Sequence, residues 1–445
     1  MYLKGIGAGS GTAGQRNRKG NPPMKKLLTM ILALTIVCGC LFSTASAGTS
    51  GMYEYTLKSD GTVEITNVDR KCSDSVIPAE LDGHKVTSIG RSAFFYCTKL
   101  TNVTIPDGVT SIDFFAFCGC SGLKSISIPD SVTSISEGAF ADCTKLTSIQ
   151  LSPSHPVYVF NNDMLIEKKT MTLLQYTGKG GDYEVFWGIK KIGAGAFEGK
   201  SLKSVKIPDT VTEIGDFAFR SIRGLKSVTL PDSLTSMGFQ QFYGDSQLQS
   251  ITLPAGLKEL GYGSFGWCTG LKSIEVSPEN PYFEMKDNML IEKATQKLVY
   301  FMDTVKGSLE IPDGIWELGA NAFENNKGLT EVIIPNSVTK ITNSAFNGCQ
   351  NIAKITLPEG LKEIEYYTFE RCAKLESLVI PDGVYYIGGY AFEDCKNLKE
   401  LVIPASVTQI MDNAFYGCKK LVCTVTEGSY AQKYCEKNEI KYTVK

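Results

Sequence analysis

Apolar positions recur along this chain with a period of 23 residues, much longer than the period of a helix or of a strand. Each unit carries a small residue followed by phenylalanine. These phenylalanines are Phe94, Phe117, Phe140, Phe197, Phe219, Phe242, Phe265, Phe323, Phe346, Phe369, Phe392 and Phe415. Most neighbours are 23 residues apart, and the two longer gaps each correspond to two units plus an insertion. Such regularity predicts a chain built from stacked, similar coils.

One complete unit illustrates the pattern. Leu123 opens a Leu-x-x-Ile-x-Ile segment that ends at Pro129, a Val-x-x-Ile segment ends at Ile135, and Phe140 and Cys143 follow. Proline has no amide donor, so it ends a strand and turns the chain out of the ladder. A period of about 20 to 29 residues with this strand pattern is typical of leucine-rich repeats. The pattern therefore predicts a β-rich repeat solenoid in which each coil buries its apolar positions against its neighbours.

Two insertions interrupt the period at about residues 152–186 and 277–311. Both carry a Met-Leu-Ile-Glu-Lys segment, at residues 164–168 and 289–293, and both are predicted to be β-hairpins. Their likeness indicates that a block of roughly 125 residues was duplicated. Two arrangements remain open. The hairpins either project as a binding rim or thicken one coil of the solenoid.

Both ends of the repeat region carry predicted caps, which open solenoids require. Tyr53 to Ile65 reads as a hairpin with a turn at Asp60-Gly61, while Ser429 precedes a short helix over 430–437 and a strand over 441–444. The predicted organisation is an upstream segment that is untranslated or disordered (1–23), a signal peptide (24–47), an N-terminal β cap (48–82), the leucine-rich repeat solenoid (83–421) and a C-terminal cap (422–445).

The signal peptide is predicted from Met24-Lys-Lys, the apolar run that follows it, and Ala45-Ser-Ala47. Export with cleavage after Ala47 is one outcome. The alternative is a lipid anchor at Cys40, because Gly39-Cys40 at the end of an apolar segment resembles a lipoprotein cleavage site. No later apolar run approaches the roughly 18 residues that a membrane span needs.

The cysteines follow the repeat. Most lie three residues after the phenylalanine of their unit, and Ile222, Asp245 and Asn326 occupy the same position elsewhere. Disulfides or a metal ladder are one interpretation of these cysteines in an exported chain. Buried free thiols are the interpretation that we favour, because cysteine packs as a small apolar residue and the chain has only 2 histidines to complete metal sites.

The net charge and the absence of catalytic motifs argue against two classes of function, nucleic-acid binding and catalysis. A formal charge of -2 offers no basic field for nucleic acid. His84 and His155 are far apart in sequence, and neither a nucleophile elbow nor a phosphate-binding loop is present. The chain is therefore predicted to be neither an enzyme nor a cofactor-binding protein.

Ile-Pro, Val-Thr-x-Ile-Gly and Ala-Phe-x-x-Cys recur in register over about residues 53–445 and resemble the BspA-like leucine-rich repeat family of bacterial secreted and surface proteins. The resemblance implies a secreted or cell-surface protein that binds extracellular protein or glycan, with host matrix or other cells as partners and adhesion as its role. A structural or scaffold role in the cell envelope, without a specific soluble ligand, is the alternative.

Candidate binding residues are aromatic. Two adjacent units carry tyrosines where other units mostly carry small or polar residues, and a tryptophan stands in one of the same columns three units earlier. The candidates are Tyr366, Tyr367, Tyr385, Tyr386, Tyr390 and Trp316. Exposed tyrosines give a large contact area with a polar tip. They also pack between coils in solenoids, so a structural role is the competing interpretation, as is a plain solvated face for the Ser, Thr and Lys residues of the strands.

Overall fold

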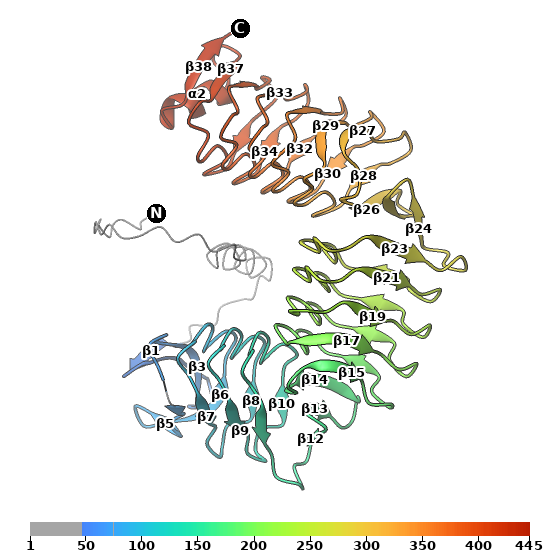
Figure 1. Cartoon of the computed structure of the whole chain (residues 1–445). Helices are drawn as coiled ribbons and strands as arrows, with labels where there is room; N and C mark the ends of the chain where they lie inside the picture. Colours follow the sequence, from blue (N-terminus) through green and yellow to red (C-terminus); the bar gives the residue numbers. More distant parts are fainter. Residues whose placement is uncertain (1–46, 74) are drawn as a thin grey trace, which may run out of the picture. The chain divides into compact units, whose positions relative to one another are not determined.

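The computed structural model of the chain describes residues 47–445, with the exception of residue 74. Its repeat region is a β-solenoid, as the period predicts, and successive coils add parallel strands in steps of one unit (Figure 1). Ser125 and Ile126, for example, stand opposite Asn102 and Val103 of the coil before. Each regular coil contributes one strand to a row of long strands, most of them three to five residues long, and one two-residue strand to a row of short strands; β4 Ser75–Val76, at the start of the long row, has only two residues.

The strands fall into two rows. The long strands are β4 Ser75–Val76, β7 Asn102–Thr104, β9 Ser125–Ser127, β11 Ser148–Gln150, β15 Gly181–Glu184, β17 Leu202–Lys206, β19 Ser227–Thr229, β21 Ser250–Leu253, β23 Ser273–Val276, β27 Gly307–Glu310, β29 Leu329–Ile333, β31 Lys354–Thr356, β33 Ser377–Val379, β35 Glu400–Val402 and β37 Val422–Val425. The short strands are β8 Ser111–Ile112, β10 Ser134–Ile135, β16 Lys191–Ile192, β18 Glu213–Ile214, β20 Ser236–Met237, β22 Glu259–Leu260, β28 Glu317–Leu318, β30 Lys340–Ile341, β32 Glu363–Ile364, β34 Tyr386–Ile387 and β36 Gln409–Ile410.

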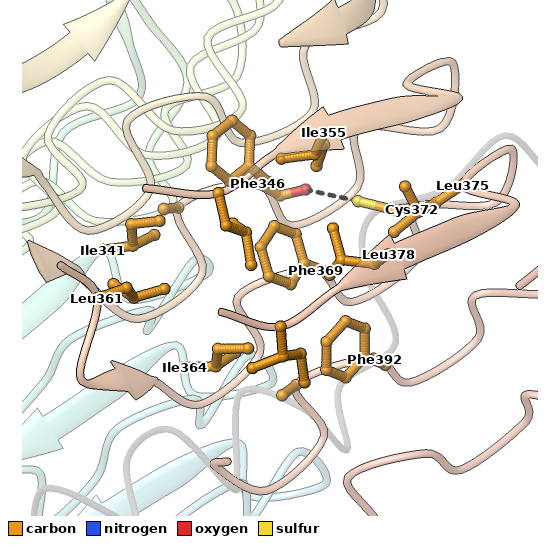
Figure 2. Close-up of a cluster of buried hydrophobic side chains, with 14 of the residues drawn as sticks. Ile341, Phe346, Ile355, Leu361, Ile364, Phe369, Cys372, Leu375, Leu378 and Phe392 are labelled. Carbon is orange, nitrogen blue, oxygen red and sulfur yellow. Dashed lines mark hydrogen bonds between the residues drawn. The ribbon is translucent and has the colours of Figure 1, made fainter. Parts of the chain in front are cut away.

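The phenylalanines of the repeat stack inside the coils. Phe369 lies between Phe346 and Phe392, with ring centroids 5.7 and 5.3 Å away, and all three side chains are fully buried (Figure 2). Leucine and isoleucine from both strand rows surround them. Because such rings contact one another from coil to coil, the stability of a coil depends on its neighbours. The buried core falls into three clusters, which divide at the two insertions.

The repeat cysteines are buried free thiols, apart from the partly buried Cys418. From the second coil onward each thiol donates to the carbonyl of the phenylalanine one coil earlier, and Cys372 to Phe346 is drawn in Figure 2. These bonds, at 2.9–3.3 Å, join Cys120, Cys143, Cys268, Cys349, Cys372, Cys395 and Cys418 to Phe94, Phe117, Phe242, Phe323, Phe346, Phe369 and Phe392. The preference for buried free thiols is thus supported, and each thiol also satisfies a buried acceptor.

Lys200 lies three residues after Phe197, at the position where most coils carry cysteine. The sequence pattern did not identify this lysine. Its Nζ donates to the carbonyls of Cys143 and Leu146 at 3.0 and 3.3 Å. Burial lowers the pKa of Lys200 to about 8. A long cationic side chain therefore replaces the thiol as the donor between these coils.

The insertions are three-stranded rather than two-stranded. The first contains β12 Tyr158–Asn161, β13 Met164–Glu167 and β14 Thr172–Tyr176, and the second contains β24 Phe283–Lys286, β25 Met289–Glu292 and β26 Lys297–Phe301. β14 pairs in parallel with β16, and β26 with β28, so both insertions continue the row of short strands. Because β14 is buried along its whole length, the insertion is part of the solenoid wall, and of the two open arrangements the thickened coil is the observed one.

His155 has a structural role at the start of the first insertion. Its Nε2 lies 3.2 Å from the Pro129 carbonyl, and its Nδ1 accepts from the amides of Val157 and Tyr158. In the second insertion Asn280 takes the same place. Its amide donates to the Pro254 and Leu257 carbonyls, and its oxygen accepts from two following amides.

Histidine and asparagine are thus equivalent ways to satisfy the same backbone groups, and this equivalence gives a prediction. We expect His155→Ala to lower the free energy of unfolding by about 2–3 kcal/mol, because buried backbone donors lose their acceptor. His155→Asn should cost less than about 1 kcal/mol. Urea titrations of both variants measure the difference, and equal losses would contradict the assigned role.

Both predicted caps are present. In the N-terminal cap β2 Tyr53–Leu57 pairs antiparallel with β3 Val63–Val68. β3 in turn pairs in parallel with β6 His84–Ile89, and β5 Glu80–Leu81 pairs antiparallel with β6. β1 Ala47–Ser50 adds a strand that the pattern did not predict. The upstream segment 1–23, the lipid anchor at Cys40 and all of the signal peptide except Ala47 lie outside the described residues.

At the other end, α2 Tyr430–Lys437 begins after Ser429, whose hydroxyl accepts from the Gln432 amide as an N-cap. β38 Lys441–Val444 then pairs with β37 and covers the last long strand. Among the helices of residues 47–445, none is both long and apolar enough to cross a bilayer.

Candidate binding surface

The tyrosines lie around one edge of the row of short strands. Tyr386 opens β34, where Ile387 points into the core and Tyr386 stays partly exposed. Tyr367 and Tyr390 hold the same position in successive coils, and both have a φ of 58°. Their shared backbone conformation places one ring above the other.

Four of the five tyrosines form one group, which we call the tyrosine cluster: Tyr366, Tyr367, Tyr386 and Tyr390. Tyr367 and Tyr390 stack with centroids 5.2 Å apart and planes 5° apart. Tyr366 lies 6.4 Å from Tyr367 and 6.3 Å from Tyr386. The cluster is therefore connected through ring contacts across two coils.

Tyr385 lies beside the cluster, and its hydroxyl donates to Glu363. Tyr366 and Tyr385 expose 38% and 44% of their surface. Asn413 donates to the Tyr390 hydroxyl from the next coil. The surface thus combines exposed ring faces with hydrogen-bonding groups held in place by their neighbours.

Burial makes two hydroxyls of the cluster, those of Tyr367 and Tyr386, harder to ionise. Burial raises the pKa of Tyr367 to about 12, and the neighbouring Tyr390 and Glu393 raise it as well. Burial followed by the contact with Tyr366 raises the pKa of Tyr386. Burial also raises the pKa of Glu365, although Lys340 opposes the shift. At neutral pH Tyr367 and Tyr386 therefore present uncharged phenol donors.

Trp316 stands apart from the cluster. It is 55% exposed and precedes β28, in the column that continues through Thr339 and Lys362 to Tyr385. Backbone bonds join Thr339 to Trp316 and Tyr385 to Lys362, which fixes this order. With strands about 4.8 Å apart, three coils separate Trp316 from Tyr385 by roughly 14 Å.

The sequence pattern did not identify Trp187, the most exposed large aromatic side chain of the described residues, or its neighbour Phe186. Phe186 and Trp187 expose 47% and 73% of their surface and stand where most coils carry proline and aspartate. They follow β15, directly after the first insertion. The interrupted proline column is the signal that could have identified them.

A second aromatic row is structural. Phe115 contacts Phe217 across two intervening coils, which carry Gly138 and Gly195 in the same column. A Cβ on Gly138 would meet the Phe115 ring at 3.1 Å. Arg220 packs over Phe217, and both Phe115 and Phe217 are almost fully buried. These rings therefore fill space between coils.

A shallow hollow of about 300 Å³ lies beside Phe114. Four carboxylates line it, and Lys191 spans two of them, at 2.8 Å from Glu137 and 2.6 Å from Glu213. Within residues 47–445 no three His, Cys, Asp or Glu side chains are placed to hold a metal ion. His84 contacts the Gly61 carbonyl, and His155 has the structural role given above.

Comparison with protein families gives a match to the model described as BspA type leucine rich repeat region, in six copies over residues 73–177, 190–306 and 295–422. No curated protein matches the chain.

Several solved structures are similar. A leucine rich cell surface protein from Faecalibacterium prausnitzii is 28% identical, with a TM-score of 0.53 over 90% of this chain and 98% of that one. The pneumococcal vaccine antigen PcpA is 20% identical, with a TM-score of 0.50 over 91% and 100%. A leucine-rich repeat protein from Bacteroides ovatus is 27% identical, with a TM-score of 0.37 over 91% and 99%.

Proposed function

Because this chain belongs to the BspA-type leucine-rich repeat family, we propose that it is an exported, non-catalytic protein that binds an extracellular protein or glycan through its tyrosine cluster. The bound partner belongs to a host matrix or to another cell, and the chain acts at the cell surface or after release. Neither a cofactor nor nucleic acid takes part.

Two comparisons support this setting. The family repeats cover well over half of the chain, and repeat proteins of this kind present extended surfaces for interaction. The protein from F. prausnitzii, described as a leucine rich cell surface protein, is similar over nearly its whole length. A surface location is therefore a reasonable inference for this chain, together with the predicted signal peptide at 24–47.

The observation that carries the proposal is the exposure of tyrosine rings in and beside the tyrosine cluster. Tyr366 in the cluster and Tyr385 beside it leave large parts of their rings in solvent, although burial of aromatic surface is favourable. Tyrosine recurs at recognition surfaces because a rigid ring gives contact area at little cost in entropy, while the hydroxyl finds a polar partner. A column of threonine or serine at these positions would keep the fold without such a surface.

The test begins with the purified full chain on arrays of matrix proteins and glycans. For the ligand that binds, we expect Tyr366→Ser and Tyr386→Ser each to weaken binding roughly 30-fold, the effect of losing about 2 kcal/mol at a recognition hot spot. Surface plasmon resonance measures the affinities.

Tyr416→Ser is the matched control, because Tyr416 is 63% exposed on a coil beyond the cluster. It should bind as the parent chain does. Equal weakening in all three variants, or none in the first two, would refute the role of the cluster. An absence of saturable binding together with retention in the cell envelope would instead favour the scaffold role.

A further inference from the structure

A carboxylate lies directly beside the tyrosine cluster on the row of short strands. Glu363 opens β32 and stands opposite Tyr386 of β34, so the two side chains point to the same face of the row. This is the outer face, because both side chains are partly exposed whereas Ile364 and Ile387, which follow them, are buried. A carboxylate and a tyrosine ring therefore lie side by side, on strands about 4.8 Å apart.

A second carboxylate, Glu365, precedes Tyr366 at the edge of the cluster. Its Oε2 accepts from the Asn343 amide at 2.9 Å, and the Asn343 side chain accepts from the Tyr366 amide at 3.1 Å. Glu365 is only partly buried, and Tyr366 is exposed. These paired hydrogen bonds hold the backbone that carries both side chains, so the carboxylate and the ring stay next to each other.

A glycine keeps the Tyr366 ring open on the side of the next coil. Gly389 holds the position of Tyr366 one coil later, and a Cβ there would lie 3.2 Å from the ring. Among the twelve units that carry the repeat phenylalanine, only this one has glycine at that position. A larger side chain would cover part of the ring. Its absence leaves aromatic surface available to a partner.

The negative charge beside the cluster is not fully neutralised by the chain itself. In the part of the chain that the structure describes, neither Glu363 nor Glu365 forms a salt bridge. The Lys362 ammonium points toward the turn at Gly383, where a Cβ would lie 3.2 Å from it. Burial raises the pKa of Glu365, and repulsion from Glu363 adds to the shift, although Lys340 opposes it. A bound cation would relieve this repulsion.

A cation fits both the rings and the carboxylates. The face of an aromatic ring attracts ammonium and guanidinium groups, and a carboxylate accepts charge-assisted hydrogen bonds from them. We propose that the tyrosine cluster recognises a lysine or arginine side chain of an extracellular protein, held against the rings of Tyr366 and Tyr386 and paired with Glu363 and Glu365. This inference rests on the proposed function, and it narrows the partner from protein or glycan to a basic segment of a protein.

The same charges argue against a glycan. A neutral sugar could stack on the tyrosine rings, but it would leave the repulsion between Glu363 and Glu365 in place. A sugar that carries carboxylate or sulfate would increase this repulsion. Complementary charge is what steers a partner to a surface and excludes wrong partners, and here it selects a basic one.

The test measures binding of a short oligolysine peptide to the purified full chain by isothermal titration calorimetry. The parent chain should bind this peptide but not the same peptide with acetylated side chains. We expect Glu363→Gln/Glu365→Gln to weaken binding roughly 10-fold, the effect of losing two partly exposed ion pairs. Tyr366→Ser should weaken it about 5-fold through loss of the cation–ring contact. Glutamine keeps an acceptor for the Asn343 amide, so an unchanged melting temperature checks that the double variant is folded.

Glu376→Gln/Glu400→Gln is the matched control, because it removes two exposed carboxylates from the side of the long strands. It should bind oligolysine within about twofold of the parent chain. Equal weakening in both double variants would show general attraction to an acidic surface and would overturn the inference. Undiminished binding of the acetylated peptide would also overturn it.

The same variants distinguish failure of this inference from failure of the proposed function. If a ligand from the arrays loses affinity in Tyr366→Ser but not in Glu363→Gln/Glu365→Gln, the cluster is a binding site and the preference for a cation is wrong. If the array ligands bind Tyr366→Ser and the parent chain equally, the proposed function itself is wrong.

Discussion

Replacing Phe369 by alanine is expected to lower the free energy of unfolding by about 3–5 kcal/mol, a large share of the stability of a typical domain. The ring is fully buried between Phe346 and Phe392 (Figure 2). Backbone bonds from Phe369 to Ala391 and from Phe346 to Thr368 hold the coils at fixed spacing, so the cavity cannot collapse. Urea unfolding followed by circular dichroism measures the loss.

Tyr416→Ala is the control for this experiment, because it removes a ring of similar size from an exposed site. A change within about 0.5 kcal/mol is expected there. If Phe369→Ala cost no more than Tyr416→Ala, the phenylalanine column would not be the core of the solenoid.

Stability is expected to fall by several kcal/mol as the pH rises from about 5 to 8, because two buried carboxyls are protonated more readily in the folded chain than in the unfolded one. Burial raises the pKa of Glu198 to about 8, although Arg220 opposes the shift. Burial raises the pKa of Glu324 to about 7, although Trp267, Asn321 and Tyr243 donate to its carboxylate.

The sign follows from where the protons are bound. Below about pH 4.5 both carboxyls are protonated in both states, so their contribution is fully present. As the pH rises, the unfolded chain loses these protons first, and the stabilisation is lost until the folded pKa values have been passed. Lys200, with a lowered pKa of about 8, stays charged in both states over most of this range and adds little slope.

The Glu198→Gln/Glu324→Gln variant should lose most of this slope, whereas Glu359→Gln, at an exposed position, should keep it. Free energies of unfolding at pH 5, 6, 7 and 8 measure the slopes. A double variant with the slope of the parent chain would assign the pH dependence to other groups, such as Asp142 and Asp245, whose pKa values burial also raises.

The repeat, the two rows of strands and both caps could be predicted because they depend on residue type at a fixed period. Phe369 contacts Phe346 of the preceding coil because the two residues occupy the same position in successive units. The N-cap at Ser429 was predictable because its signal is local. For these features, the spacing of residues in the sequence is enough to predict which residues are in contact.

Contacts that break the period could not be predicted in this way. Glu324 accepts from Tyr243 at 3.1 Å although 81 residues separate them and the coil of Phe265 lies between their coils. Lys200 stands where other coils carry cysteine, and Trp187 follows the position where they carry proline. The pattern shows that these two residues differ from the repeat, but it does not show what they contact. Their roles depend on which neighbour the side chain reaches.

For the tyrosines, the repeat register predicted that they lie on two adjacent coils. It did not predict that the Tyr385 hydroxyl would donate to Glu363, or that the other four rings would form the cluster. Ring orientation depends on the left-handed backbone at Tyr367 and Tyr390, and a single sequence does not reveal that conformation. The location of the candidate site was therefore predictable, whereas its geometry was not.

The most direct test of the account is hydrogen–deuterium exchange of the full chain with and without the ligand that the arrays identify. We predict protection of peptides that contain Tyr366, Tyr386 and Tyr390, with unchanged exchange around Tyr416. Protection confined to the long strands β7 to β11, or to Phe186 and Trp187, would contradict the assignment of binding to the tyrosine cluster.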